Sequence, residues 1–92
     1  MLKIQLSKRA YKFFTHLPPK QTRQLKDKIQ LLRADSLPPD SKQLVGYSTY
    51  HRVDVGEYRI IYKVESEVLM IILIGKRNDS DIYRRMKRLL KH

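Results

Sequence analysis

The stretch "VDVGEYRIIYKV" (53–64) has the pattern of a β-hairpin, and it decides how the rest of the chain can fold. Two runs rich in Val, Ile and Tyr flank Gly56 and Glu57, and a glycine at the first position of a two-residue turn fits type II′. Side chains alternate between the two faces of a strand. One face, which we assign to the core, carries His51, Val53, Val55, Tyr58, Ile60 and Tyr62. The opposite face carries Arg52, Asp54, Arg59, Ile61 and Lys63.

The same alternation predicts the register of the hairpin. With a two-residue turn, Asp54 lies opposite Arg59 and Val53 lies opposite Ile60. A shift of one residue would bury the charged side chains, at a cost of several kcal/mol for each unpaired charge. We therefore expect the charged face to be open to solvent or to a ligand.

The segments around the hairpin alternate between strand and helix patterns. Ser7 is placed to cap a helix, and "LPP" (17–19) ends that helix and starts a second one. A stretch with two prolines and a glycine, residues 36–48, indicates a loop. The expected elements are a strand at 2–7, two helices up to about residue 34, strands at about 48–55, 57–64 and 67–75, and a last helix beginning near Asp79 or Ser80.

This element order, β-α-α-β-β-β-α, predicts an α+β fold. We expect a four-stranded, mostly antiparallel sheet with an N-terminal αα-hairpin and a C-terminal helix, the helices covering one face. Ninety-two residues suffice for one modest core, so residues 1–92 are expected to form a single domain.

Composition excludes several classes of function. The chain has no cysteine, which excludes disulfides, thiolate zinc sites and cysteine nucleophiles, and weakly favours the cytoplasm. No apolar run is long enough to span a membrane. We find no P-loop, no dinucleotide motif and no histidine pair at metal-ligand spacing, so we expect neither metal nor cofactor. We expect His51 to be packed on the core face, and His92 to lie in a frayed terminus.

Charge is concentrated at the two ends of the chain. The sequence has 20 Lys and Arg against 9 Asp and Glu, for a net charge of +11. Residues 1–33 carry nine basic and one acidic residue (net +8), residues 34–75 four and six (net −2), and residues 76–92 seven and two (net +5). A small domain with this imbalance typically binds a polyanion or an acidic protein. A merely solvated basic surface is the alternative.

Cationic and aromatic side chains are predicted to meet near the end of the last strand. Lys76 and Arg77 follow directly from that buried strand, so their backbone is held rigidly. Tyr83 lies in the first turn of the last helix, beside its apolar stripe. Together with Arg52 and Arg59 on the neighbouring strands, these side chains can converge on one phosphate group.

The segments "QLVGYSTYHRVDVGEYRIIYKV" (43–64) and "GKRNDSDIY" (75–83), taken with the element order, resemble the RelE/ParE toxin superfamily. The resemblance covers nearly the whole chain and points to the RelE-like branch, toxins of type II toxin–antitoxin systems with a microbial-RNase-like fold. It implies an endoribonuclease that cleaves mRNA in the ribosomal A site, without a metal, and so inhibits translation. In this reaction a ribose 2′-OH attacks the adjacent phosphate, and fixed guanidinium groups stabilise the developing negative charge.

The resemblance also implies roles for the candidate site residues. Arg52 matches a basic position near the scissile phosphate, and Arg59 matches the arginine that binds and stabilises that phosphate. Arg77 matches an arginine near the leaving oxygen, and Tyr83 a tyrosine that stacks on or orients the substrate. Contacts with the RNA backbone are expected from four more residues, Lys63, Lys76, Arg84 and Arg88.

Asp54 departs from the family pattern, which often has a basic residue at this position. A cross-strand pair with Arg59 would hold that arginine and contribute about 0.2–1 kcal/mol. Beside a phosphate, the Asp54 carboxylate would either weaken cleavage or act as a general base, since arginine is a poor one. The sequence leaves both readings open.

The family resemblance further implies partners. These are the ribosome with its mRNA, and a cognate acidic antitoxin that folds onto the basic surface, in agreement with the net charge of +11. Two other functions stay open at this point. One is a ParE-like toxin that binds DNA gyrase and cleaves no RNA; the other is an inactive basic RNA-binding domain.

Overall fold

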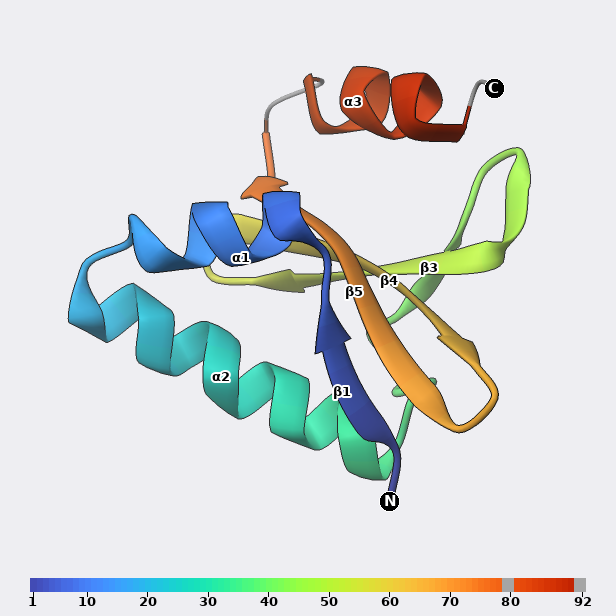
Figure 1. Ribbon diagram of the computed structural model, residues 1–92, viewed down its shortest axis with the longest axis horizontal. Coiled ribbons are helices and arrows are strands. Elements are labelled where there is room, and N and C mark those ends of the chain that lie inside the picture. Colours follow the sequence, from blue (N-terminus) through green and yellow to red (C-terminus); the bar gives the residue numbers. More distant parts are fainter. Residues whose placement is uncertain (79–80, 91–92) are drawn as a thin grey trace.

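The structure is a computed structural model that describes residues 1–78 and 81–90. The elements in chain order are β1 (Lys3–Leu6), α1 (Lys8–Thr15), α2 (Pro19–Ala34), β2 (Lys42–Leu44), β3 (Tyr47–Val55), β4 (Tyr58–Glu65), β5 (Val68–Lys76) and α3 (Asp81–Leu90). The strands form one sheet in the order β1-β5-β4-β3-β2. Figure 1 shows α1 and α2 side by side against this sheet, with α3 apart from them beyond the end of β5.

The predicted α+β fold and its mostly antiparallel sheet are confirmed, but the sheet has five strands and not four. The fifth strand, β2, lies in the segment predicted to be a loop, and it pairs antiparallel with β3 through Lys42–Arg52 and Gln43–His51. A strand of three residues is too short to show an alternating pattern, which is why the prolines and glycine around it dominated the prediction. β1 pairs in parallel with β5, so the sheet is mixed.

The register predicted for the β3–β4 hairpin is confirmed. Asp54 pairs with Arg59, Val53 with Ile60 and Val55 with Tyr58. Gly56 has a φ of +57°, the sign that a type II′ turn requires at its first central position.

The main core lies between the first face of the sheet and the α1–α2 hairpin. Ser7 caps α1 as predicted, because its hydroxyl accepts a hydrogen bond from the backbone N–H of Ala10 at 3.0 Å. The buried side chains of this core are Ala10, Leu25, Ile29, Leu32, Val53, Ile60, Tyr62, Leu69, Ile71 and Ile74. Tyr62 also donates a hydrogen bond of 2.6 Å to the Ser36 carbonyl, and burial raises the pKa of its phenol.

The second face of the sheet is not fully open, and here the prediction that the helices cover one face was wrong. Helix α3 packs on this second face, where Ile82 and Met86 bury Ile61 in a smaller core with Leu44 and Leu73. The sequence placed Ile61 among the charged residues of an open face because the hairpin pattern says nothing of what covers a sheet.

A β-bulge supplies apolar residues to both cores. Ile61 pairs with Leu73 but Tyr62 pairs with Ile71, so Ile72 is an extra residue in β5. Both Ile72 and Leu73 then belong to the smaller core, while Ile71 stays in the main core. The unbroken apolar run of β5 is therefore needed on both faces.

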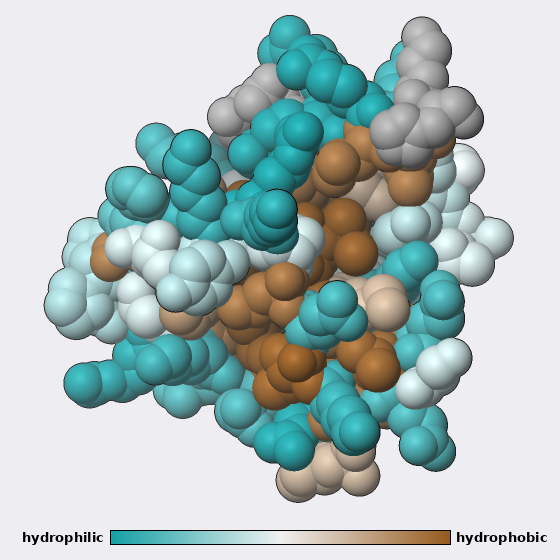
Figure 2. Space-filling model, in the orientation of Figure 1, coloured by the Kyte–Doolittle hydropathy of each residue, from teal (hydrophilic) through white to brown (hydrophobic). Residues whose placement is uncertain are grey.

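Figure 2 shows hydrophobic residues gathered over the middle of the visible face, around β1, with hydrophilic residues around them. A groove of about 530 Å³ opens there, lined on its apolar side by Ile4, Leu6, Phe14 and Ile29. Across residues 1–78 and 81–90, no helix combines the length and the apolar character needed to cross a bilayer.

The β4–β5 turn stores backbone strain that a substitution should relieve. Ser66 and Glu67 have φ values of +51° and +63°, and they form a two-residue connection between Glu65 and its partner Val68. Non-glycine residues rarely adopt this conformation, whereas Asn-Gly is the preferred pair in such turns. We expect Ser66→Asn with Glu67→Gly to stabilise the fold by about 1 kcal/mol and to raise Tm by about 4–8 °C.

Thermal unfolding followed by circular dichroism tests this expectation. Ser66→Ala with Glu67→Ala is the control, because it removes the same side chains without favouring positive φ, and it should not raise Tm. If the Asn-Gly variant is no more stable than the wild type, then the Ser66 and Glu67 side chains stabilise the fold by as much as the backbone strain destabilises it.

Candidate functional site

Arg59 is held in a bidentate pair with Asp54 on the second face of the sheet. Its Nε donates a hydrogen bond of 2.7 Å to Asp54 Oδ1, and its Nη2 donates one of 3.3 Å to Asp54 Oδ2. The Arg59 side chain is only 13% exposed, against 36% for Asp54, so the ion pair lies at the floor of the site. The planar guanidinium is thereby fixed in one orientation.

Tyr83 reaches the same guanidinium from helix α3. Arg59 Nη1 donates a hydrogen bond to the Tyr83 hydroxyl, and the guanidinium carbon lies 5.7 Å from the centre of the tyrosine ring. Tyr83 as a residue is 38% exposed, so it is accessible from solvent. Packing of Ile82 and Met86 in the smaller core positions the first turn of α3, and with it Tyr83.

Arg52 and Arg77 complete the cluster around the Asp54 carboxylate. Hydrogen bonding from Arg59 lowers the pKa of Asp54, and the charges of Arg59, Arg52 and Arg77 lower it further. In turn, the hydrogen bonds with Asp54 raise the pKa of Arg59. The backbone N–H of Arg77 donates a hydrogen bond of 2.8 Å to the Glu57 carbonyl, which ties the end of β5 to the hairpin turn.

The structure thus brings together five residues singled out from the sequence: Arg52, Asp54, Arg59, Arg77 and Tyr83. Three guanidinium groups and a phenol lie around one carboxylate and form a site suited to an anion. The carboxylate, that of Asp54, is already paired with the Arg59 guanidinium. Such an arrangement can bind a phosphate group and stabilise charge that develops on it.

The other basic residues singled out from the sequence lie outside this cluster. Lys63 is four positions further along β4, where its amine lies 3.1 Å from a Glu65 oxygen and 5.4 Å from the centre of the Tyr50 ring. Lys76 ends β5 and is exposed. Arg84 and Arg88 are exposed on α3.

Two histidines and the start of the last helix were also considered from the sequence. His51 is packed as expected, with its ring 5.8 Å from that of Tyr62. His92 and the predicted N-cap positions Asp79 and Ser80 lie outside the described residues. In the described part of the chain, no group of three His, Asp or Glu side chains could hold a metal ion.

Sequence reasoning missed a second group of basic residues. Nothing in the sequence distinguishes Arg85 from the other basic residues of the last helix, but it is half-buried and turned inward toward α1. There it lines a cleft together with Arg9, Lys12, Phe13 and His16. The only signal in the sequence was the excess of basic residues in 1–33. That excess does not indicate that residues of α1 and α3 line the same cleft.

Comparison with known families identifies one matching model. The model described as the ParE toxin of type II toxin–antitoxin systems, parDE, matches residues 4–80. A curated protein of Methanocaldococcus jannaschii, named "Putative toxin RelE1", is 29% identical over 79 residues, which cover 80% of this chain and 88% of that protein.

Solved structures show the same fold. The isolated RelE toxin of E. coli has a TM-score of 0.76 at 24% identity, with 98% of this chain and 100% of that chain covered. The toxin chain of the RelB–RelE antitoxin–toxin complex from Methanococcus jannaschii has a TM-score of 0.67 at 24% identity, with 87% and 95% covered. A free double mutant of the E. coli toxin has a TM-score of 0.78 at 25% identity, with 97% and 98% covered.

Proposed function

Because this chain belongs to the ParE toxin family of type II toxin–antitoxin systems, we propose that it is an endoribonuclease toxin that cleaves mRNA in the ribosomal A site. Inhibition of translation follows from that cleavage. The proposal treats residues 1–92 as one RelE-like toxin domain acting in the cytoplasm.

The observation that carries the proposal is the fixed guanidinium of Arg59 among Arg52, Arg77 and Tyr83. In the proposed reaction, the 2′-oxygen of a ribose loses its proton and bonds to the adjacent phosphorus, while the bond from phosphorus to the 5′-oxygen of the next nucleotide breaks and that oxygen gains a proton. The products are a 2′,3′-cyclic phosphate and a 5′-OH. Negative charge grows on the phosphoryl oxygens, and cations held in place before the reaction stabilise it without reorganising. Tyr83, which is exposed and contacts Arg59, is suited to orient the nucleotide.

Asp54 limits this activity in our proposal. Its two oxygens occupy the Nε and Nη2 donors of Arg59, one of the two donor pairs through which an arginine binds a phosphate in bidentate fashion. Because three arginines lower the pKa of its carboxyl group, Asp54 is a weak base at neutral pH. Of the two readings left open by the sequence, this geometry favours the inhibitory carboxylate over the general base.

An acidic antitoxin belongs to the proposal as the partner of this chain. The net charge of +11 favours an acidic partner. The groove between β1, α1 and α2 offers apolar side chains, with Lys26 and Asp27 at its side, so an amphipathic segment would match its apolar lining, and the acidic character of the partner rests on the net charge of the chain. RNA contacts by Lys63, Lys76, Arg84 and Arg88 remain part of the proposal as sequence-independent backbone contacts.

Cleavage of mRNA in a translating extract tests the nuclease assignment. The 5′ ends of message fragments are mapped by primer extension for the wild type, Arg77→Ala and the control Arg23→Ala, which removes an exposed arginine on α2. We expect cuts inside codons of translated message only, reduced at least about tenfold by Arg77→Ala and unchanged by Arg23→Ala.

Two outcomes would contradict the proposal. Blocked protein synthesis with intact mRNA would exclude the nuclease. Inhibition of gyrase supercoiling without any effect on mRNA would favour the ParE-like alternative, which works by protein binding.

A further inference from the structure

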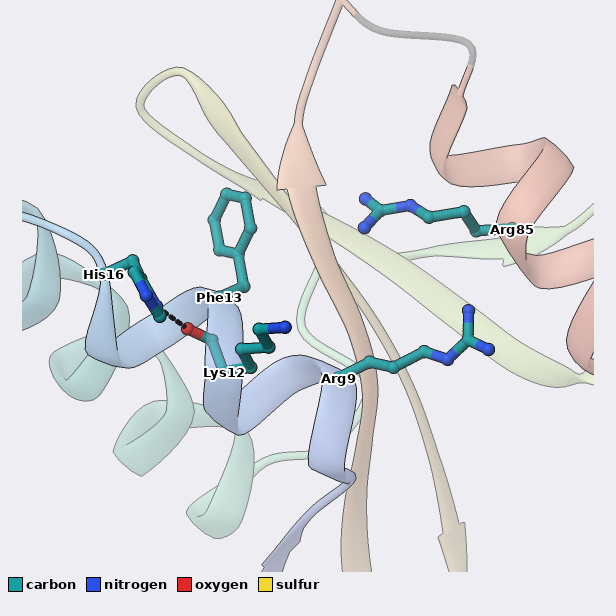
Figure 3. A pocket seen from close by; sticks show the side chains of 5 residues that line it. All are labelled: Arg9, Lys12, Phe13, His16 and Arg85. Carbon is teal, nitrogen blue, oxygen red and sulfur yellow. Dashed lines mark hydrogen bonds between the residues drawn. The ribbon is translucent and has the colours of Figure 1, made fainter.

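A basic cleft lies between α1 and α3, at the end of the sheet where β5 leads into α3. Its volume is about 380 Å³, and its lining residues are Arg9, Lys12, Phe13, His16 and Arg85. Figure 3 shows the cationic ends of Arg9, Lys12 and Arg85 reaching into the space between the two helices, with the Phe13 ring beside them. We refer to this feature as the α1–α3 cleft.

The position of Arg85 in the cleft depends on Gly75. A Cβ added at Gly75 would lie 2.8 Å from Arg85 Nη2, so the Arg85 side chain would have to move, and 3.2 Å from Ile82 Cδ1, which is a tight contact. The absence of a side chain at Gly75 therefore lets the Arg85 guanidinium lie directly over β5. Gly75 is also the register partner of Arg59, so the α1–α3 cleft adjoins the Arg59 cluster across β5.

The two cations that α1 contributes to the cleft are not balanced by any acidic residue among its described lining residues. None of its five lining residues is acidic. Arg9 and Lys12 are exposed, and neither forms an ion pair with any residue of the described chain. Arg9 and Lys12 lie three positions apart on α1, so their like charges repel, and an anion bound beside them would reduce that repulsion.

Phe13 and His16 add ring surfaces to the cationic lining. The Phe13 ring is held by an edge-to-face contact with Tyr58, with ring centres 5.9 Å apart. His16 Nδ1 donates a hydrogen bond of 2.7 Å to the Lys12 carbonyl, so its imidazole is also anchored. Cations together with a fixed aromatic ring are the combination that binds a phosphate and the base attached to it.

We infer that the α1–α3 cleft is a second RNA-binding subsite, which takes a nucleotide phosphate between Arg9, Lys12 and Arg85 and places the base against Phe13. The inference rests on the proposed function in one respect, that RNA is the source of the phosphate. A strand bound at the Arg59 cluster would pass over the end of β5 and place a neighbouring nucleotide in the cleft.

Binding of an uncleavable RNA to the purified full chain tests the inference. The probe is a short fluorescein-labelled RNA with 2′-O-methyl groups throughout, so that the attacking 2′-OH of the proposed reaction is absent. Affinity is measured by anisotropy at several salt concentrations. We expect Arg9→Ala with Lys12→Ala to weaken binding about tenfold, and to reduce the magnitude of the salt slope by about 1.

The matched control is Lys20→Ala with Arg23→Ala, which removes one exposed lysine and one exposed arginine from α2. This control should weaken binding less than about threefold, as expected for a general loss of charge. Equal losses in the two double variants would overturn the inference. Gly75→Ala changes no charge but displaces Arg85, so it should also weaken binding, provided that circular dichroism shows the folded state.

Competition identifies the source of the phosphate. Displacement of the probe by adenosine monophosphate, from the wild type but not from the cleft variant, would support a site for one nucleotide. Displacement only by an oligonucleotide, with the same dependence on Arg9 and Lys12, would support a site for a chain. The binding assay does not depend on cleavage. If the extract assay shows no mRNA cleavage but binding still depends on the cleft residues, only the nuclease assignment is contradicted.

Discussion

Replacement of Arg59 by alanine is expected to reduce mRNA cleavage by about a hundredfold to a thousandfold, the usual effect of removing one preorganised group that stabilises transition-state charge. The Arg59 side chain is only 13% exposed, and it is held by both Asp54 and Tyr83. No neighbouring arginine can replace its bidentate geometry. The measurement is the rate at which primer-extension stops accumulate in a translating extract.

Two further variants separate charge from geometry at this position. Arg59→Lys keeps the positive charge but loses the planar pair of donors, so it should restore only part of the rate. Arg59→Ala with Asp54→Ala removes the carboxylate that the single variant leaves without its partner. Cleavage by Arg59→Ala at the wild-type rate would contradict the assignment of the phosphate site to this cluster.

Replacement of Asp54 by asparagine is expected to increase both RNA affinity and cleavage by about ten- to a hundredfold. The carboxylate lies where the proposed RNA substrate would bind, and like charges in such contacts cost several kcal/mol. Asparagine has nearly the same shape, but it removes the charge and one of the two acceptors for Arg59. The loss of the ion pair should lower the free energy of unfolding by only about 1 kcal/mol, since Asp54 is partly exposed.

Asp54→Lys provides the opposing test. If Asp54 only obstructs the substrate, lysine at this position should also increase cleavage, because it adds a cation beside the phosphate. If Asp54 is the general base, both variants should lose cleavage while RNA affinity still rises. Unchanged affinity in both variants would contradict our view that Asp54 competes with the substrate for Arg59.

In the proposed function, the Arg59–Asp54 ion pair has two effects. It gives the half-buried guanidinium a partner in the folded protein, and it limits the binding of RNA. Without a substrate, Arg59 has a partner for its donors, so a half-buried guanidinium is not left unsatisfied. The cluster is therefore ordered before RNA arrives. In the proposed function, RNA would have to displace a carboxylate that belongs to the same sheet, and this competition would weaken its binding.

The local pattern of the sequence determined the hairpin and the residues of the site. Only one register of a two-residue turn keeps Asp54 and Arg59 out of the core, and that register is the one observed. The Ser7 cap and the apolar stripe of α2 were likewise predictable, because caps and helical periodicity depend on neighbours a few residues apart. Resemblance to a toxin family assigned roles to Arg52, Arg77 and Tyr83, and these roles remain proposals.

Only the tertiary structure decided how distant elements meet. Strand β2 forms because the edge of β3 offers it backbone partners, and Ile61 is buried because α3 crosses the second face of the sheet. The contact of Tyr83 with Arg59 joins residues 24 positions apart, and the α1–α3 cleft joins the first helix to the last. Sequence periodicity describes which face of an element is apolar, but not which element will cover it. The packing of α3 therefore placed both the phenol on the candidate phosphate site and Arg85 in the cleft.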